Sequence, residues 1–270
     1  MEIKLAIPDN FIYNWLIKNS EIVCRDYNVK IYKVSEEKCI ELMLSGKVDT
    51  ALLSPRGYGL GVGKTDFVII PSAAFSTVGF TGLASIYFKE DLRTIETIAT
   101  PSPDDFLIKI GILMLAERYN MHPEVIKTEG SVNDLLKKAD AAIIWGFGSA
   151  QSNALDVSEE WFDSFEMPLP LAMWVCKSLE HPENIEEIVM NLSDKNIEAE
   201  QQVLEEEQID NSPCLAREGL IIREFNKEIE TSLDQTLQFL FFHQHLNEIP
   251  AVKIMGRDEE KPPDEISSVN

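Results

Sequence analysis

Two aspartates and an arginine are the residues of this sequence best suited to chemistry on a charged ligand. Asp104 and Asp105 lie in "IATPSPDDFLIK" (98–109), where a β-branched stretch and two prolines lead into a helical pattern. Backbone N–H groups at a helix N-terminus favour an anion, so an aspartate there either caps the helix or keeps an anionic ligand out. Arg56 follows the strand-like run "TALLS" and could form a bidentate pair with a ligand carboxylate. An inward ion pair from Arg56 to Asp104 or Asp105, which would close the pocket, is the other interpretation.

Neutral hydrogen-bonding residues follow several of the predicted strands. Each of them alone is more often a turn residue than a ligand contact, but together, on loops that converge, they predict a pocket. They are Asn10, Ser54, Ser76, Thr77 and Thr81. Trp145 and Phe147 could stack on an unsaturated ring, although aromatic residues at a strand end more commonly belong to the core.

The segment "GYGLGVGKT" (57–65) resembles a phosphate-binding loop because it ends in Gly-Lys-Thr. The motif GxxxxGK[ST] would need glycine at position 58, which is Tyr58. Lys64 and Thr65 also lead into the strand-like "DFVII" and not into a helix that could hold phosphates. A glycine-rich loop connecting two strands at the rim of a cleft is the better interpretation.

Charge and composition exclude several classes of partner. The chain has 24 basic and 46 acidic residues, and its net charge of −22 would repel nucleic acid and anionic lipid. The start, "MEIKLAIPDN", reads as a strand, and no apolar run approaches membrane-spanning length. We therefore expect a cytoplasmic protein with neither nucleic-acid nor membrane partners. The four cysteines, Cys24, Cys39, Cys176 and Cys214, lack paired or metal-like spacing, which predicts buried reduced thiols and no metal site.

Strand-like and helix-like patterns alternate in two series, which predicts two α/β lobes with largely parallel sheets. We expect the lobes to be joined by two extended crossings, near 84–89 and 170–176. This is the two-lobed, periplasmic-binding-protein-like (type II) fold, whose ligand lies in the cleft between the lobes, at the carboxyl ends of the strands. The predicted first lobe comprises 1–88 and 177–270, and the second 89–176.

The C-terminal part is expected to be helical, with helices near 184–206 and 223–246 packed on the first lobe and a short final strand in "AVKIM". The tail 256–270 is charged, contains prolines and has few apolar residues, so we expect it to be disordered.

Six stretches, taken in order, resemble the signature segments of the futalosine-pathway menaquinone-biosynthesis family, which includes chorismate dehydratase and the enzyme that cyclises dehypoxanthine futalosine. The most specific is "LDVSEEWFDSFEMPLPLAMWV" (155–175); the others are "VDTALLSPRGY", "STVGFTGLASIYF", "IATPSPDDFLIKIGILML", "DAAIIWGFGSA" and "FLFFHQHLNEIPAV". The resemblance places Asn10 where the dehydratases carry a cleft asparagine. It implies the two-lobed fold, a cytoplasmic location, and a carboxylate-bearing small-molecule substrate turned over without a cofactor. Chorismate dehydratase is a lyase that eliminates water to give 3-enolpyruvylbenzoate, which requires a proton acceptor and donors that hold two carboxylates.

The sequence departs from the dehydratase pattern at three cleft positions. Asp105-Phe106 stands where the dehydratases usually have a Thr-Ser pair, and Leu83, in "GFTGL", falls where they have serine. The strand 141–145 ends in "WGFGS", where they have Gly-Asp and the cyclising relatives a histidine. No catalytic base is assigned. We expect binding of chorismate or a related small carboxylic acid by Asn10, Ser54, Arg56, Ser76 and Thr77, with Thr81, Asp105 and Trp145 also in the cleft. The alternative is a non-catalytic cytoplasmic binding protein on the same scaffold.

Overall fold

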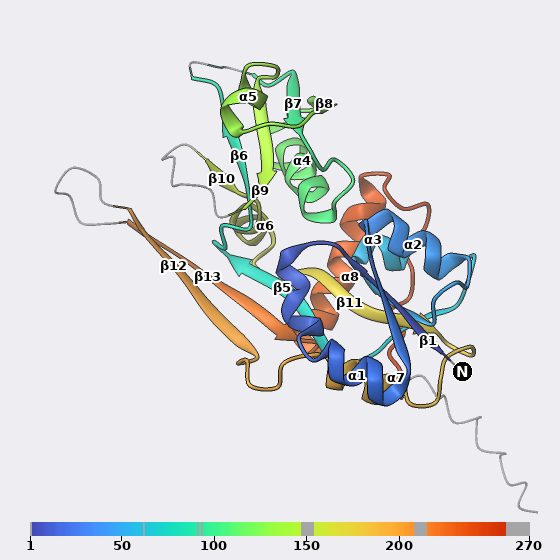
Figure 1. The fold of residues 1–270 in the computed structure, drawn as a ribbon. Helices are drawn as coiled ribbons and strands as arrows, with labels where there is room; N and C mark the ends of the chain where they lie inside the picture. The colour runs from blue at the N-terminus through green and yellow to red at the C-terminus, as the bar shows by residue number, and fades with distance from the viewer. Residues whose placement is uncertain are drawn as a thin grey trace, which may run out of the picture.

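The computed structural model describes residues 2–61, 63–90, 92, 94–146, 154–207 and 215–257. Their strands form two sheets in two lobes (Figure 1). The larger sheet has the order β12-β13-β5-β11-β3-β1-β2, with β4 beside β11, and the smaller sheet has the order β10-β6-β9-β7-β8. This confirms the mixed α/β fold with two lobes.

The larger sheet combines a parallel part with an antiparallel one. Strand β1 is parallel to β2 and β3, whereas β11 is antiparallel to β3, β4 and β5. Its strands are β1 (Ile3–Pro8), β2 (Val29–Val34), β3 (Thr50–Leu53), β4 (Phe67–Ile69), β5 (Ala73–Gly79), β11 (Leu169–Lys177), β12 (Glu200–Glu207) and β13 (Leu215–Glu224). The helices of this lobe are the 3₁₀ helix η1 (Phe11–Ile17), α1 (Ser20–Tyr27), α2 (Glu36–Leu44), α3 (Pro55–Gly59), α7 (Ile185–Leu192) and α8 (Lys227–Phe242).

The sheet of the smaller lobe also combines a parallel part with an antiparallel one. Strand β7 pairs in parallel with β8 and β9, and β6 pairs antiparallel with β9 and β10. The strands are β6 (Ala84–Phe88), β7 (Thr97–Thr100), β8 (Glu124–Lys127), β9 (Ala141–Trp145) and β10 (Leu155–Asp156), and the helices are α4 (Phe106–Tyr119), α5 (Val132–Leu136) and α6 (Val157–Phe165).

The two lobes share a hydrophobic core. Trp161 of α6 is fully buried and lies against Phe239 of α8, with ring centroids 5.2 Å apart, while Phe165 closes the cluster at 4.4 Å from Trp161. Because α6 belongs to the chain segment that returns from the smaller sheet and α8 packs on β11 of the larger one, this aromatic cluster ties the lobes together.

The predicted crossings at 84–89 and 170–176 are corrected by the sheet topology. Residues 84–88 form β6 of the smaller sheet and 169–177 form β11 of the larger sheet. The chain therefore leaves the larger sheet after Gly79 and returns to it at Leu169, so 84–88 belongs with the second lobe and 169–176 with the first. Apolar runs such as "LPLAMWVC" suit a buried central strand as well as a connecting segment, and pairing alone distinguishes the two.

A hairpin replaces much of the expected C-terminal helix structure. The helices are shorter than predicted, and residues 200–207 and 215–224 form β12 and β13, which extend from the larger sheet (Figure 1). The Glu- and Gln-rich "EQQVLEEE" has helix-favouring composition, but its pairing as β12 with β13, which itself pairs with β5, overrides this local preference. The hairpin approaches closely because Gly219 lies opposite Gly79, and a Cβ at Gly219 would stand 1.7 Å from the carbonyl oxygen of Phe80.

Three further predictions concern the C-terminal tail, membrane-spanning helices and the state of the cysteines. Of the tail, Gly256 and Arg257 are described, with Arg257 Nη1 2.6 Å from Glu230 Oε2, and residues 258–270 lie outside the described residues. Within the described ranges, none of the helices has the length and hydrophobicity needed to cross a membrane. Cys39 and Cys176 are buried free thiols, Cys24 is a half-buried one, and Cys214 lies outside the described residues.

Candidate functional site

A small cavity lies where strand ends of the two lobes meet. Its volume is about 40 Å³. The larger lobe contributes the end of β1, the start of η1 and the start of α2, and the smaller lobe contributes the residue before α4 and the end of β9. The lining residues are Pro8, Asp9, Asn10, Tyr13, Ser35, Glu36, Asp105 and Trp145. This is the position at the carboxyl ends of strands that the fold predicts for a ligand.

Glu36 is the central polar residue of this junction. Ser35 caps α2, with its side chain accepting from the backbone N–H of Lys38, so Glu36 is the first residue of the helix. Its side chain turns inward and is buried, with the residue only 9% exposed. Glu36 Oε1 lies 2.5 Å from the Ser54 hydroxyl, and Oε2 accepts a hydrogen bond of 2.9 Å from the backbone N–H of Phe106. A carboxylate of the larger lobe therefore occupies the N-terminus of α4 in the smaller lobe.

The environment of Glu36 favours its neutral form. Burial raises its pKa to about 7, against the lowering effects of the hydrogen bonds from Ser54 and Phe106. The nearby carboxyl of Asp105 raises the pKa further, and the guanidinium of Arg56 lowers it. Burial, with the charges of Glu36 and Asp105, also raises the pKa of Tyr13 well above its ordinary value. The junction thus contains a carboxyl group that titrates near neutral pH.

The two aspartates before α4 have different partners, and the exclusion of an anionic ligand by Asp105 stays a prediction. Asp105 is the N-cap residue by position, but its side chain makes no capping hydrogen bond; its Oδ2 accepts from Trp145 Nε1 at 2.8 Å. Burial raises the pKa of Asp105, and the Trp145 hydrogen bond lowers it. Asp104 pairs with Lys109, 3.1 Å away. The alternative of an ion pair from Arg56 to either aspartate is therefore wrong, because Asp104 pairs with Lys109 and Asp105 with Trp145.

Arg56 lies on α3, close to Glu36 but without a hydrogen bond to it. Ser54 caps α3 by accepting from the N–H of Gly57 at 3.2 Å, which sets Arg56 in the first turn. The Nε atom of Arg56 is buried and has no hydrogen-bond partner among the described residues. His245 lies within electrostatic reach: burial, then the positive charges of Arg56 and Lys109, lower its pKa. Arg56 of the larger lobe and Lys109 of the smaller lobe therefore both lie close enough to His245 to act on it.

The other predicted site residues divide into two groups. Asn10 lines the cavity, and its Oδ1 accepts from the N–H of Ile12 at 3.2 Å, capping η1. Ser76 and Thr77 lie within β5 and not on a loop, and their fully buried hydroxyls have no partner in the part of the chain that the structure describes. Thr81 donates to Ser158 at 3.0 Å. The structure thus brings Asn10, Asp105 and Trp145 to the cavity and Ser54 and Arg56 to its border, but not Ser76, Thr77 or Thr81; Phe147 lies outside the described residues.

Sequence reasoning missed Glu36 and Tyr13. The signal for Glu36 was available, since Ser35 directly follows β2 and has the residue type of a helix cap, which places the next side chains at a strand's carboxyl end. Tyr13 carried no such signal, because its place among apolar residues of η1 reads as core.

Asp156, within the family-specific segment, holds the chain crossing together. Its carboxyl is buried and accepts from the backbone N–H groups of Gly82 at 2.8 Å, Glu159 at 3.0 Å and Thr81 at 3.4 Å. Burial raises its pKa to about 6, while these hydrogen bonds lower it. Asp156 caps α6 and fixes the loop between β5 and β6, so its role is structural.

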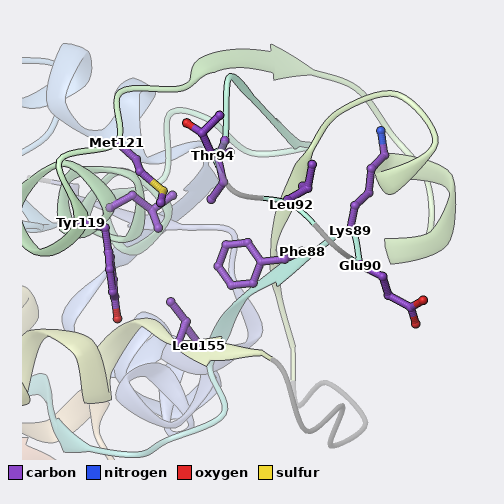
Figure 2. A pocket seen from close by; sticks show the side chains of 10 residues that line it. Phe88, Lys89, Glu90, Leu92, Thr94, Tyr119, Met121 and Leu155 are labelled. Atoms are coloured by element: carbon purple, nitrogen blue, oxygen red, sulfur yellow. The ribbon is translucent and has the colours of Figure 1, made fainter.

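A larger cavity of about 360 Å³ lies in the smaller lobe, at the end of β6 (Figure 2). Phe88 points into it between Tyr119 and Leu155, whereas Lys89 and Glu90 point away from it (Figure 2). Specific ligand sites combine apolar walls with convergent polar groups, and here the charged side chains do not converge. We therefore place the candidate site at the junction of the lobes. Among the described residues, no three His, Cys, Asp or Glu side chains are grouped so as to hold a metal ion.

Comparison with known proteins supports the fold and gives the family. The periplasmic aliphatic sulphonate binding protein of Escherichia coli aligns over 98% of this chain and 97% of its own, with a TM-score of 0.51 and 9% identity. A protein of Bordetella bronchiseptica RB50 gives a TM-score of 0.52 at 11% identity, over 71% of this chain and 69% of its own. A protein of Archaeoglobus fulgidus gives a TM-score of 0.50 at 14% identity, over 69% of this chain and 71% of its own. These similarities show a periplasmic-binding-protein-like fold.

Comparison with curated protein sequences finds no match. The family model described as "Menaquinone biosynthesis" matches residues 6–235, which include both lobes and every residue of the inter-lobe cavity. The chain therefore belongs to the menaquinone-biosynthesis family.

Proposed function

We propose that this protein binds chorismate or a related small carboxylic acid between its lobes, in the cytoplasm. Family membership supports the ligand class, and the cavity at the strand ends supports the place. The observation that carries the proposal is Arg56, whose Nε is buried without a hydrogen-bond partner among the described residues. A buried guanidinium N–H group without a partner is costly, and a ligand carboxylate would satisfy it.

Electrostatics at the junction supports an acid as ligand once the cleft is open. Burial lowers the pKa of His245, and Arg56 and Lys109 lie close enough for their positive charges to lower it further. Glu36 is the carboxyl group nearest to Arg56 in the closed form, but burial favours its neutral form and it makes no hydrogen bond to Arg56 Nε. A ligand carboxylate that replaces Glu36 beside Arg56 would gain both the guanidinium and the N–H of Phe106.

Elimination of water from chorismate is the reaction that the family suggests. The base must take a ring proton while the hydroxyl group leaves as water, and a base is most effective when its pKa lies near the working pH. Glu36, with a pKa of about 7, is the group on the cavity wall that meets this condition. Tyr13 and Asn10 line the same cavity and could donate to the departing hydroxyl. No cofactor is required for this chemistry.

Non-catalytic binding is the second candidate, and a specific observation favours it. Leu83 stands where the dehydratase pattern has serine and is buried, with 2% exposure, so this position offers an apolar side chain in place of a hydroxyl. Asp9, Glu36 and Asp105 give the cavity three carboxyl groups, a lining that suits a hydroxylated or cationic ligand better than a dicarboxylate.

The test is incubation of the purified protein with chorismate, followed by mass-spectrometric detection of 3-enolpyruvylbenzoate, with an active chorismate dehydratase as positive control. Calorimetric titration with chorismate runs in parallel. Product establishes the lyase. Saturable binding without product establishes the binding protein, and absence of both overturns the assignment of chorismate as ligand.

A further inference from the structure

We propose that Glu36 is a built-in latch: it reaches across the cleft to the N-terminus of α4 and holds the ligand-free protein closed, so that a ligand must displace it to enter. This inference concerns the regulation of the proposed ligand site and relies on that proposal only for the statement that the cleft admits a ligand. The closure itself follows from contacts within the chain.

The first step is the geometry of the contact. Glu36 belongs to α2 of the larger lobe, and the Phe106 N–H to which it binds belongs to α4 of the smaller lobe. Ser54 fixes the other carboxyl oxygen from the larger lobe at 2.5 Å. An N–H group in the first turn of a helix has no partner within the helix, so the Phe106 N–H depends on a group from outside. Two further polar contacts span the lobes: His243 to Glu117 at 3.2 Å, at an exposed site, and the half-buried ion pair of Arg217 on β13 with Glu159 on α6, where Nε lies 3.1 Å from Oε2.

The second step is the space that closure leaves. A cavity of about 40 Å³ holds a water molecule or two, whereas sites for small organic ligands have volumes of roughly 300–1,000 Å³. With Glu36 in place, the junction is therefore too small for a ring-bearing acid. Entry requires the lobes to part, which breaks the bond between Glu36 and Phe106.

The third step is the response of the latch to pH. When protonated, Glu36 can donate to Ser54 and still accept from Phe106, so the closed form keeps both hydrogen bonds of Glu36. When ionised, it is a buried charge whose hydrogen-bond partners among the described residues, Ser54 and Phe106, are both neutral. The titratable or charged groups that face this junction are Tyr13 of η1, Cys39 of α2, Arg56 of α3, Asp105 before α4, and Asp9 at the end of β1. His245, after α8, lies within electrostatic reach of Arg56 and of Lys109 of α4. Of these, Arg56 favours the ionised form of Glu36 and Asp105 opposes it.

The sign of the effect follows from the two pKa values. Burial raises the pKa of Glu36 from 4.5 to about 7 in the closed form, and opening exposes the carboxyl to water. The closed form therefore binds the proton more tightly. The extra stability that proton binding by Glu36 gives the closed form is complete below about pH 4.5 and is lost as the pH rises to about 7. Acid holds the latch shut, and neutral to alkaline pH releases it.

The experiment measures closure directly and uses no ligand. Hydrogen exchange of the Phe106 amide, expressed as a protection factor relative to the intrinsic rate at each pH, is followed by NMR from pH 5 to pH 8. Small-angle X-ray scattering gives the radius of gyration over the same range. The variants are Glu36→Gln, whose amide can make both hydrogen bonds without titrating, Glu36→Ala, which removes the latch, and Glu37→Gln, an exposed neighbour on α2 that serves as the matched control.

In the wild type, we expect the protection of Phe106 to fall roughly 10- to 100-fold from pH 5 to pH 8, with an increase in the radius of gyration. Glu36→Gln should keep the pH 5 protection throughout, Glu36→Ala should lose it throughout, and Glu37→Gln should follow the wild type. Protection that is independent of pH in the wild type, or a Glu36→Gln variant with the wild-type profile, overturns the latch. Because no chorismate is added, a failure here is separate from a failure of the proposed ligand.

Discussion

One carboxyl oxygen of Glu36 lies 2.9 Å from the backbone nitrogen of Phe106, although the two residues are 70 positions apart and belong to different lobes. Figure 1 shows the corresponding ends of α2 and α4 meeting where the lobes adjoin. The helix N-terminus of the smaller lobe is thus satisfied by a side chain of the larger lobe, and the aspartates that precede α4 bind elsewhere. In the closed form, this contact buries the Glu36 carboxyl and places it on the wall of the cavity.

Arg56 tests the ligand class. If chorismate binds, Arg56→Gln should weaken binding by about 2–5 kcal/mol, because the variant loses a buried charge-assisted pair with the ligand carboxylate. Calorimetry at constant ionic strength measures the change. Arg25→Gln, at an exposed site on α1, is the control and should bind as the wild type does. Equal affinity of the Arg56 variant and the wild type would contradict a role for Arg56 in binding.

Asp105 tests the electrostatic coupling within the cavity. In Asp105→Asn, the side-chain oxygen can still accept from Trp145, but the negative charge that raises the pKa of Glu36 is gone. We expect the pKa of Glu36 to fall in this variant. Titration of the ¹³C-labelled side-chain carboxyl of Glu36 by NMR measures it. Asp104→Asn, where the carboxyl pairs with Lys109, is the comparison, and an equal effect of both variants would argue against direct coupling through Asp105.

Asp156 tests the crossing between the lobes. Asp156→Ala leaves the N–H groups of Thr81, Gly82 and Glu159 without their acceptor, and we expect a loss of about 1–3 kcal/mol in the free energy of unfolding. Urea denaturation measures the loss, with Asp163→Ala, an exposed carboxylate on the same helix, as control.

The pH dependence of that loss has a definite sign. Burial raises the pKa of Asp156 from 3.8 to about 6 in the folded protein, so its protonation adds stability that is complete below about pH 4 and is lost as the pH rises through 6. The penalty of Asp156→Ala should therefore be larger at pH 4.5 than at pH 7.5. A penalty that grows with pH would show that the folded protein holds this carboxyl ionised.

Gly219 tests the docking of the hairpin. A methyl group at this position would meet the carbonyl oxygen of Phe80 at 1.7 Å, and backbone cannot yield as a flexible side chain does. Gly219→Ala should therefore lower the free energy of unfolding by about 1–3 kcal/mol and increase hydrogen exchange along β13. Glu218→Ala, the exposed neighbour, should leave both unchanged. Normal exchange in Gly219→Ala would mean that β13 does not need its close approach to β5.

The sequence by itself determined the α/β class, the two-lobed fold and the family. Alternating strand and helix patterns carry these features locally, and the segment 155–175 carried the family resemblance. Asn10, Asp105 and Trp145 could be expected at the cavity because strand ends converge in this fold, and the cavity lies where they meet. Nothing in local pattern opposed these assignments.

Tertiary structure decided which strands pair and which side chains contact one another across the lobes. Ser76 and Thr77 are polar residues in a stretch that reads as a loop, yet pairing on both sides makes it the strand β5. The helix-favouring residues 200–207 became a strand for the same reason, since partners distant in sequence outweigh local propensity. Glu36 and Phe106 meet only when the lobes adjoin. A buried carboxyl's pKa and its hydrogen bonds depend on that meeting, and no spacing along the chain encodes it.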